Sequence, residues 1–123
     1  MNEKKAKERR RHPRYDVRYS ADVTFNNELL CGTIINISKG GVGILLPKIV
    51  PVGEMLDLRL KTVVGNNEDL RIKLRAKIVW MKEKEFLPGF FRAGLEITEI
   101  REEDKKILEK HIEDLEKNLK NEK

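Results

Sequence analysis

Hydrophobic and polar residues alternate along most of the first hundred positions of the chain. From Tyr15 to Phe25, an apolar or aromatic side chain occupies every second position and a polar or charged one stands between. This two-residue period is typical of a β-strand with one buried face, because successive side chains point to opposite faces of a sheet. Similar segments predict six strands within about residues 14–97, at positions 15–25, 29–37, 42–46, 56–61, 70–80 and 91–97.

Turn-forming residues separate the predicted strands. Asn, Gly and Pro favour turns because they accept or impose backbone conformations that end a strand. Such breaks stand at residues 26–28, 47, 51–53, 65–67 and 88–89. Because short links of this kind join neighbouring strands as hairpins, we expect an antiparallel sheet.

Near residue 101 the period lengthens to that of an α-helix. One apolar stripe runs through Leu108, Ile112, Leu115 and Leu119, with Ile107 beside it. Acidic residues at 102–104 and lysines near the end suit the two poles of a helix dipole. The pattern predicts an amphipathic helix at about residues 101–120.

These elements predict an all-β fold with a C-terminal helix, namely a six-stranded antiparallel β-barrel flanked by one α-helix. Closing the sheet would remove its exposed edges, and the helix would cap or flank the barrel through its apolar stripe. The same stripe has the spacing of a short coiled-coil seam. A monomer and a helix-mediated dimer therefore both remain open.

The positive charge of the chain is concentrated at its N-terminus. Of the net charge of +5 over 123 residues, all comes from residues 1–18, where eight Lys and Arg face three Asp and Glu; the rest balances, 18 against 18. This distribution predicts a flexible basic arm at residues 1–11 on a neutral body at residues 12–123. Such an arm suits an anionic ligand better than a uniformly basic surface would.

Little in the sequence points to catalysis or to a metal. Cys31 is the single cysteine, so an internal disulfide is excluded, and its place within a strand predicts burial. His12 and His111 stand far apart, and neither suggests a catalytic base or a metal site. The start of the chain is charged and no apolar stretch is long enough to span a bilayer. We expect a cytoplasmic protein that is not an enzyme and has no metal or cofactor.

Two polar clusters stand out against the strand pattern. Residues 10–14 read Arg-Arg-His-Pro-Arg just before the first strand, and residues 36–41 read Asn-Ile-Ser-Lys-Gly-Gly after the second. The arginine guanidinium fork matches phosphate oxygens and also the paired N7 and O6 acceptors of guanine. One residue type can therefore bind both halves of a guanine nucleotide.

In these clusters the chain resembles the PilZ domain, a bacterial receptor for cyclic di-GMP. The family pattern Arg-x-x-x-Arg is matched by Arg10 and Arg14, and the pattern Asp/Asn-x-Ser-x-x-Gly by Asn36, Ser38 and Gly41. Both patterns stand in the family's order and in its structural context. The resemblance covers most of the chain and implies a PilZ-like barrel that binds cyclic di-GMP.

The resemblance gives the arginines an expected role. Arg10 and Arg14, on an arm that wraps the ligand, would take a guanine edge and a phosphate. Arg9 and Arg11 would be supplementary phosphate contacts. Ordering of the arm by the ligand would then change a surface that a partner protein recognises.

The second cluster would hold the polar edge of the ligand. Asn36 would accept from guanine N–H donors, without the charge-assisted contact of the Asp that many family members carry, and Ser38 would add a hydroxyl. Gly40 and Gly41 would let the backbone come close and adopt positive φ. Trp80 is expected to fill the core or rim of the barrel, with a base-stacking role as the lesser alternative.

Two other functions fit the residues less well. A degenerate PilZ fold could serve as a protein-interaction module that binds no nucleotide. A basic-arm nucleic-acid binder is a further alternative, but the neutral body and the lack of exposed aromatics among basic residues disfavour it. The expected partners are cyclic di-GMP and an unidentified protein, without membrane insertion.

Overall fold

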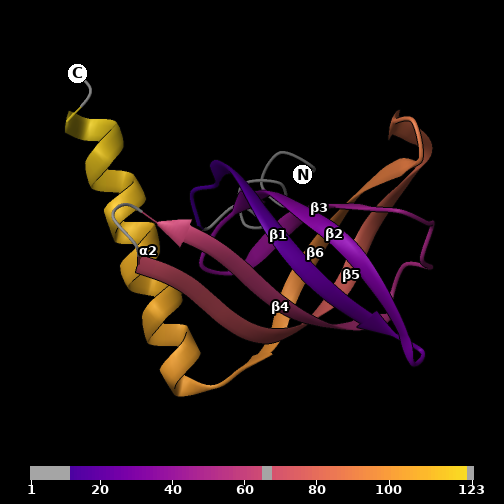
Figure 1. Ribbon diagram of the computed structural model, residues 1–123, viewed down its shortest axis with the longest axis horizontal. Helices are drawn as coiled ribbons and strands as arrows, with labels where there is room; N and C mark the ends of the chain where they lie inside the picture. Colours follow the sequence, from indigo (N-terminus) through magenta and orange to yellow (C-terminus); the bar gives the residue numbers. More distant parts are fainter. Residues whose placement is uncertain (1–11, 65–67, 122–123) are drawn as a thin grey trace, which may run out of the picture.

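The computed structural model describes residues 12–64 and 68–121, with side chains at 12–61 and 70–118. In this part of the chain the elements are β1 (Tyr15–Phe25), β2 (Glu28–Ile37), β3 (Gly41–Leu46), β4 (Met55–Val64), β5 (Glu68–Leu87), β6 (Phe90–Ile100) and α2 (Glu102–Asn121) (Figure 1). All six predicted strands and the predicted C-terminal helix are present. The predicted arm at 1–11 and the predicted break at 65–67 lie outside the described residues.

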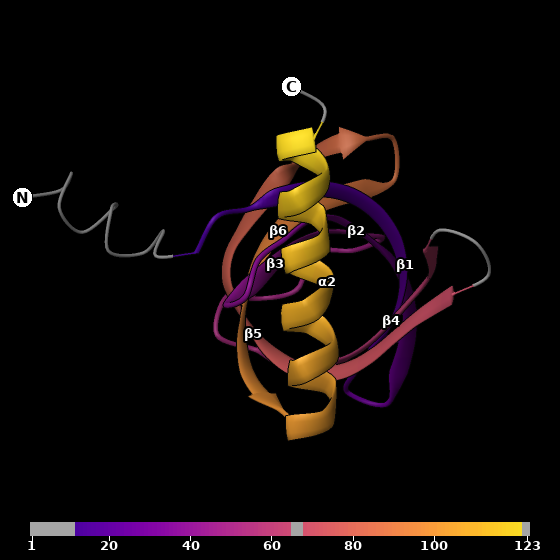
Figure 2. The ribbon, with the colours of Figure 1, turned by 90° about the vertical axis from the view of Figure 1, so that its left-hand side faces the viewer.

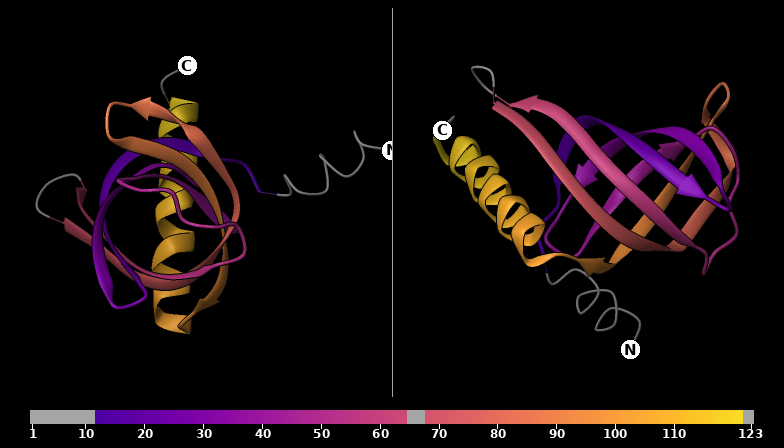
Figure 3. Two further views of the ribbon diagram at one scale, coloured as in Figure 1. Left: turned by 90° about the vertical axis from the view of Figure 1, so that its right-hand side faces the viewer. Right: turned by 60° about the horizontal axis from the view of Figure 1, so that its bottom comes forward.

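The six strands form one closed antiparallel ring. Their order is β1-β2-β3-β6-β5-β4, and β4 pairs with β1 to close it. Figure 3 (left) shows the ring with α2 behind it. Closure satisfies the backbone of each strand on both sides along the ring, which removes the open edges of a flat sheet. The predicted fold class is confirmed.

Inward-facing apolar side chains fill the ring. The alternation read from the sequence is reproduced in burial, and the largest fully buried side chains include Val23, Ile34, Ile44, Leu58 and Ile78. They come from five different strands, so the core is made by long-range contacts across the ring. Each such side chain contributes roughly 1.5–3 kcal/mol when it leaves water.

Helix α2 lies across one end of the ring (Figure 2). Leu108 and Ile112 are almost fully buried and belong to the hydrophobic core, and Leu115 packs against it. Ile107, beside the stripe, is 42% exposed. The first half of the predicted apolar stripe is therefore used within the chain, which leaves Leu108 and Ile112 no part in a coiled-coil seam.

A buried polar contact joins α2 to β1. His111 is 6% exposed, and the Tyr19 hydroxyl lies 2.5 Å from its Nε2. The two rings pack at a centroid distance of 5.5 Å. Burial lowers the pKa of the His111 imidazole below its ordinary value, although the Asp114 carboxylate opposes the shift. Burial likewise raises the pKa of the Tyr19 hydroxyl. Sequence reasoning gave His111 no role.

The β5–β6 hairpin is longer than the sequence pattern predicts. β5 runs to Leu87 rather than ending near residue 80, and β6 begins at Phe90. Residues 82–90 are all exposed, and the hairpin projects beyond the ring (Figure 3, right). Because neither face of this extension is buried, its residues carry no two-residue alternation that could reveal a strand.

Two local expectations have different outcomes. The predicted turn at residues 26–28 is confirmed, because Asn26 and Asn27 both have positive φ, at 49° and 63°, as a tight hairpin requires. The predicted burial of Cys31 is wrong, since this residue is exposed. Its neighbours Leu30 and Gly32 face inward, so the strand period turns Cys31 to the outer face. Among the helices of the described residues, none has the length and apolar character needed to cross a membrane.

Candidate functional site

Backbone pairing brings the two polar clusters to the same end of β1 and β2. Tyr15 is paired with Ile37 across the antiparallel strands. Arg14 comes one residue before Tyr15, and Ser38 comes one residue after Ile37, so both leave the pair in the same direction. The β1–β2 register therefore sets the start of the first strand beside the link that follows the second.

A side-chain contact continues this proximity. The His12 ring packs so closely on Gly40 that a Cβ added there would lie 2.9 Å from the ring Cδ2. The absence of a side chain at Gly40 thus leaves room for the His12 ring. The segment that enters β1 lies directly against the 38–41 link.

The Ser38 hydroxyl organises that link from within. Its Oγ accepts hydrogen bonds from the Gly40 and Gly41 N–H groups at 3.2 and 3.1 Å, and it lies 3.3 Å from the Gly41 carbonyl oxygen, to which it donates. The Ser38 N–H also donates to that carbonyl at 2.9 Å. At 6% exposure, Ser38 shapes the turn rather than projecting from it.

Glycine is needed in this link because neighbouring atoms lie too close for a side chain. A left-handed backbone conformation is not the reason. A Cβ on Gly41 would overlap the Leu95 carbonyl oxygen of β6, and Gly40 accepts a hydrogen bond from the Ile97 N–H at 2.9 Å. The expected positive φ is wrong for both, because among the described glycines positive φ occurs at Gly53 and Gly89. Pairing with β6 keeps the link extended enough to need no such conformation.

Outside the ring, two strand glycines form a floor next to Asn36. Asn36 is paired with Gly43, and Gly43 with Gly94. Directly paired residues point to the same face of a sheet. The Asn36 amide lies across Gly43, where a Cβ would come within 2.8 Å of its Oδ1. A glycine in a strand interior often marks such a close approach. Gly43 and Gly94 both stand inside strands, so the sequence contained a signal for this contact.

Trp80 covers the other side of this floor. It is paired with Gly94, and a Cβ on Gly94 would overlap the indole ring. Because Ala93 and Leu95 face the core, Gly94 and the indole face outward. The register shifts between Ile78 and Trp80, which turns Trp80 out of the alternation that placed it in the core or rim. The predicted placement in the core is therefore wrong, because Trp80 lies on the outer face.

Cationic side chains stand near the floor. Arg14 is exposed, and among the described residues its guanidinium has no hydrogen bond or ion pair. Arg92, two positions before Gly94 on the same face of β6, lies 4.9 Å from the Phe86 ring centroid. Its Nε is buried without a partner in the described part of the chain. Sequence reasoning missed Arg92.

Three further predicted residues, Arg9, Arg10 and Arg11, lie outside the described residues.

A separate hollow of about 750 Å³ is centred on β1, β4 and β5 and reaches Leu29 of β2 and Glu99 at the end of β6. Its lining includes none of the residues of the two motifs. No group of three or more His, Cys, Asp or Glu side chains gathers into a metal site within residues 12–64 and 68–121. The candidate site is therefore the outer face of β2, β3 and β6, together with the entry to β1.

A closed six-stranded antiparallel ring with one C-terminal helix defines the class, a small β-barrel domain. A family profile described as the PilZ domain matches residues 8–114, and the chain belongs to this family. A search of curated proteins finds no match.

Two solved structures share the fold. The Bacillus subtilis inhibitor of motility MotI/DgrA superposes with a TM-score of 0.74 at 21% identity, over 89% of this chain and 52% of that one. The PilZ domain of YcgR from Escherichia coli, solved with c-di-GMP, superposes with a TM-score of 0.65 at 19% identity, over 93% and 96%. The present chain thus spans about half the length of MotI/DgrA.

Proposed function

We propose that the protein is a receptor for cyclic di-GMP, which binds on the outer face of β2, β3 and β6 where the chain enters β1. The observation that carries the proposal is the meeting of the two motifs: the Tyr15–Ile37 pair aligns them, and His12 packs on Gly40. Membership of the PilZ family, a family of receptors for this nucleotide, supports it. So does the related fold of a YcgR domain solved with c-di-GMP.

The arginines would supply the charge. Cyclic di-GMP carries two phosphates and two guanines, and a guanidinium can form paired hydrogen bonds with either group and can stack on a base. Arg14 is exposed at the entry to β1, so it would approach from that side, with Arg10 as its partner. Arg92, two positions before Gly94 and with an Nε that has no partner among the described residues, would approach from β6.

A flat base would stack on the outer surface of the Asn36 amide and the Trp80 indole. These two groups lie low against the sheet because Gly43 and Gly94 beneath them raise no side chain of their own. Asn36 would meet the polar edge of the guanine through its carbonyl oxygen. Ser38, whose hydroxyl is used within the link, would act by holding the backbone of residues 38–41 in shape.

Energetics favour an all-or-none closure of the arm. Fixing five arm residues around a ligand costs about 5–10 kcal/mol, at ~1–2 kcal/mol per residue. One charge-assisted hydrogen bond contributes only about 1.5–3 kcal/mol, whereas micromolar binding needs about 8 kcal/mol net. Several contacts must therefore form together. The ordered arm would be the output, a new surface for a partner protein, and the receptor would perform no chemistry of its own.

Calorimetric titration with cyclic di-GMP tests the proposal. The wild-type chain is expected to bind in a saturable, stoichiometric manner. Arg14→Ala should weaken binding by about 10- to 100-fold, since it removes a charge-assisted contact worth about 1.5–3 kcal/mol. Ser38→Ala should weaken it as well, by loosening the link. Arg59→Ala, an exposed arginine on β4 away from the motifs, is the matched control and should bind like wild type.

The alternatives predict different titrations. A degenerate interaction module would show no saturable heat with the nucleotide in any variant. A nucleic-acid binder would bind single-stranded oligonucleotides with an affinity that falls steeply with salt and is indifferent to Ser38→Ala. Either result would refute the receptor.

A further inference from the structure

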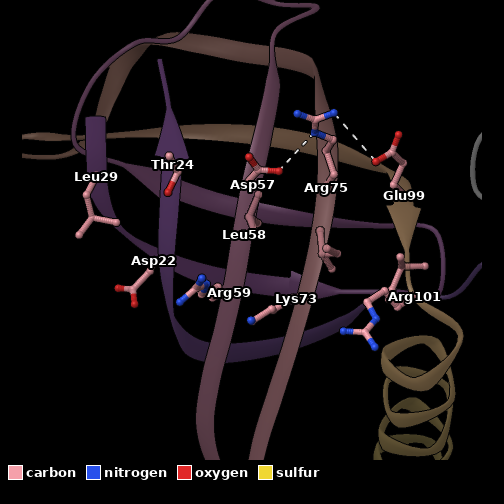
Figure 4. Close-up of a pocket in the computed structure, with 12 residues that line it drawn as sticks. Asp22, Thr24, Leu29, Asp57, Leu58, Arg59, Lys73, Arg75, Glu99 and Arg101 are labelled. Atoms are coloured by element: carbon pink, nitrogen blue, oxygen red, sulfur yellow. Dashed lines mark hydrogen bonds and ion pairs between the residues drawn. The ribbon is translucent and has the colours of Figure 1, made fainter. Parts of the chain in front are cut away.

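The hollow on β1, β4 and β5 lies on the arc of the ring opposite the candidate nucleotide site. In the strand order, β4 stands across the ring from β3, and β5 across from β2. We call it the β4–β5 hollow, and Figure 4 shows its side chains standing in two rows across the strands. Its volume of about 750 Å³ is that of a surface able to receive a ligand or a short segment of another chain.

The charged side chains of the first row pair with one another and leave one net negative charge. This row crosses the strands through Leu29, Thr24, Asp57, Arg75 and Glu99, in the register of the sheet. The Arg75 Nε lies 3.2 Å from the Asp57 Oδ1, and its Nη1 lies 4.0 Å from the Glu99 Oε2. One cation is thus shared between two carboxylates.

The second row carries cations that lack such partners. Asp22, Arg59 and Lys73 are paired across β1, β4 and β5, and they stand in line in Figure 4. The Asp22 carboxylate is already paired with Lys61, at 3.3 Å. Arg59 and Lys73 are exposed and have no hydrogen bond or ion pair among the residues described. Two adjacent positive charges therefore face the hollow unneutralised.

We propose that the β4–β5 hollow is a docking surface for an acidic segment of a partner protein. Carboxylates of such a segment would pair with Arg59 and Lys73. Leu29, 66% exposed at the β2 end of the first row, would receive an apolar side chain of the same segment. From β2 to β5 is three strand spacings of about 4.8 Å, which roughly four or five residues of extended chain can cover.

Mixed charge separates this partner from a nucleic acid. Asp22, Asp57 and Glu99 lie among the cations, and they would repel a backbone that carries a phosphate at every step. A peptide places its charges at chosen positions, and its N–H groups can donate to those same carboxylates. The surface is separate from the nucleotide site and would serve whether or not cyclic di-GMP binds.

The probe is a synthetic six-residue peptide, Glu-Gly-Glu-Ser-Leu-Gly, which places two carboxylates for Arg59 and Lys73 and one leucine for Leu29. It is titrated into the isotope-labelled full chain and followed by NMR. Amide shifts are expected to concentrate on β1, β4 and β5 around the hollow and to saturate. The same peptide with glutamines in place of glutamates should bind at least about tenfold more weakly. An equal affinity for the two peptides would overturn the proposal, as would shifts that map outside the hollow.

Charge reversal supplies the second readout. Arg59→Glu combined with Lys73→Glu should weaken peptide binding at least about tenfold, and the milder Arg59→Gln with Lys73→Gln should fall between it and wild type. Lys82→Glu, an exposed lysine on the β5–β6 hairpin, is the matched control and should stay within about twofold. If the reversal leaves peptide binding unchanged, the docking surface is wrong.

Two cross-checks keep this surface distinct from the receptor site. Arg14→Ala should leave peptide binding unchanged, and the Arg59/Lys73 reversal should leave nucleotide binding unchanged. A single-stranded oligonucleotide of equal charge should bind more weakly than the glutamate peptide. If it binds more tightly and displaces the peptide, the surface is a nucleic-acid site and the proposal fails.

Discussion

Single residues decide the surface where the two motifs meet. Gly43 and Gly94 each lie beneath a neighbouring side chain, the Asn36 amide and the Trp80 indole. Ser38 is the opposite case, a polar side chain that is buried and holds the backbone around itself. The shape of the outer face therefore depends on the two glycines, which leave room for their neighbours, as much as on the larger side chains.

Gly94→Ala tests the floor directly. The added Cβ would overlap the Trp80 indole, and overpacking of this kind costs about 1–3 kcal/mol of unfolding free energy. In a Trp80→Ala background the same change should cost little, because the overlapping ring is gone. Urea unfolding followed by circular dichroism measures both, and equal costs in the two backgrounds would contradict the contact.

Elements were predicted where one face of each is buried. β1, β4 and the ring portion of β5 bury every second residue. Because the buried positions are apolar and the exposed ones polar, these strands show a two-residue period in the sequence. The β5–β6 extension has no buried face, and the phase change before Trp80 adds an unpaired residue that no period records. Contacts between different elements likewise decide that Asn36 meets Gly43 across β2 and β3 and that Tyr19 of β1 meets His111 of α2. Local pattern carries no trace of such contacts, so the motif residues were predicted and their surroundings were not.

Substitutions at two adjacent residues test which face of α2 packs on the barrel. Leu108→Ala should lower the unfolding free energy by about 2–5 kcal/mol, because it leaves a cavity in the core. Ile107→Ala, one position away on the exposed side, should change it by no more than about 0.5 kcal/mol. Urea denaturation compares the two, and similar losses would mean that the helix packs through a different face.

The buried histidine of α2 predicts a pH dependence of stability. The folded-state pKa of His111 is lowered from 6.5, so at pH values well above 6.5 the imidazole is neutral in both states and stability is complete. As the pH falls below that value, the unfolded chain takes up the proton first, and stability decreases down to the folded-state pKa. The unfolding free energy should therefore fall between about pH 7.5 and 5.5.

His111→Gln isolates this effect from the carboxylates, which titrate mainly at lower pH. The variant should be less stable than wild type at pH 7.5, and the difference should shrink at pH 5.5. Chemical denaturation at the two pH values measures it. A constant difference would show that His111 does not titrate with folding.

The whole molecule joins two sides that face away from each other. The motifs lie at the β2–β3–β6 arc, and the hollow is centred on the β1–β4–β5 arc and reaches the ends of β2 and β6. Helix α2 lies across one end of the ring (Figure 2). Because Leu108 and Ile112 are used within the chain, we predict a monomer in the absence of ligand. Light scattering should give the mass of one chain, and a dimer mass that survives dilution would contradict this.

The position of Trp80 has a practical consequence. It is the only tryptophan of the chain, and its half-buried indole lies across Gly94 at the margin of the candidate nucleotide site. Intrinsic fluorescence excited at the red edge of protein absorption therefore reports from this one spot. A guanine bound beside the indole ring would change the tryptophan emission. Occupancy of the candidate nucleotide site could therefore be followed in the unlabelled protein.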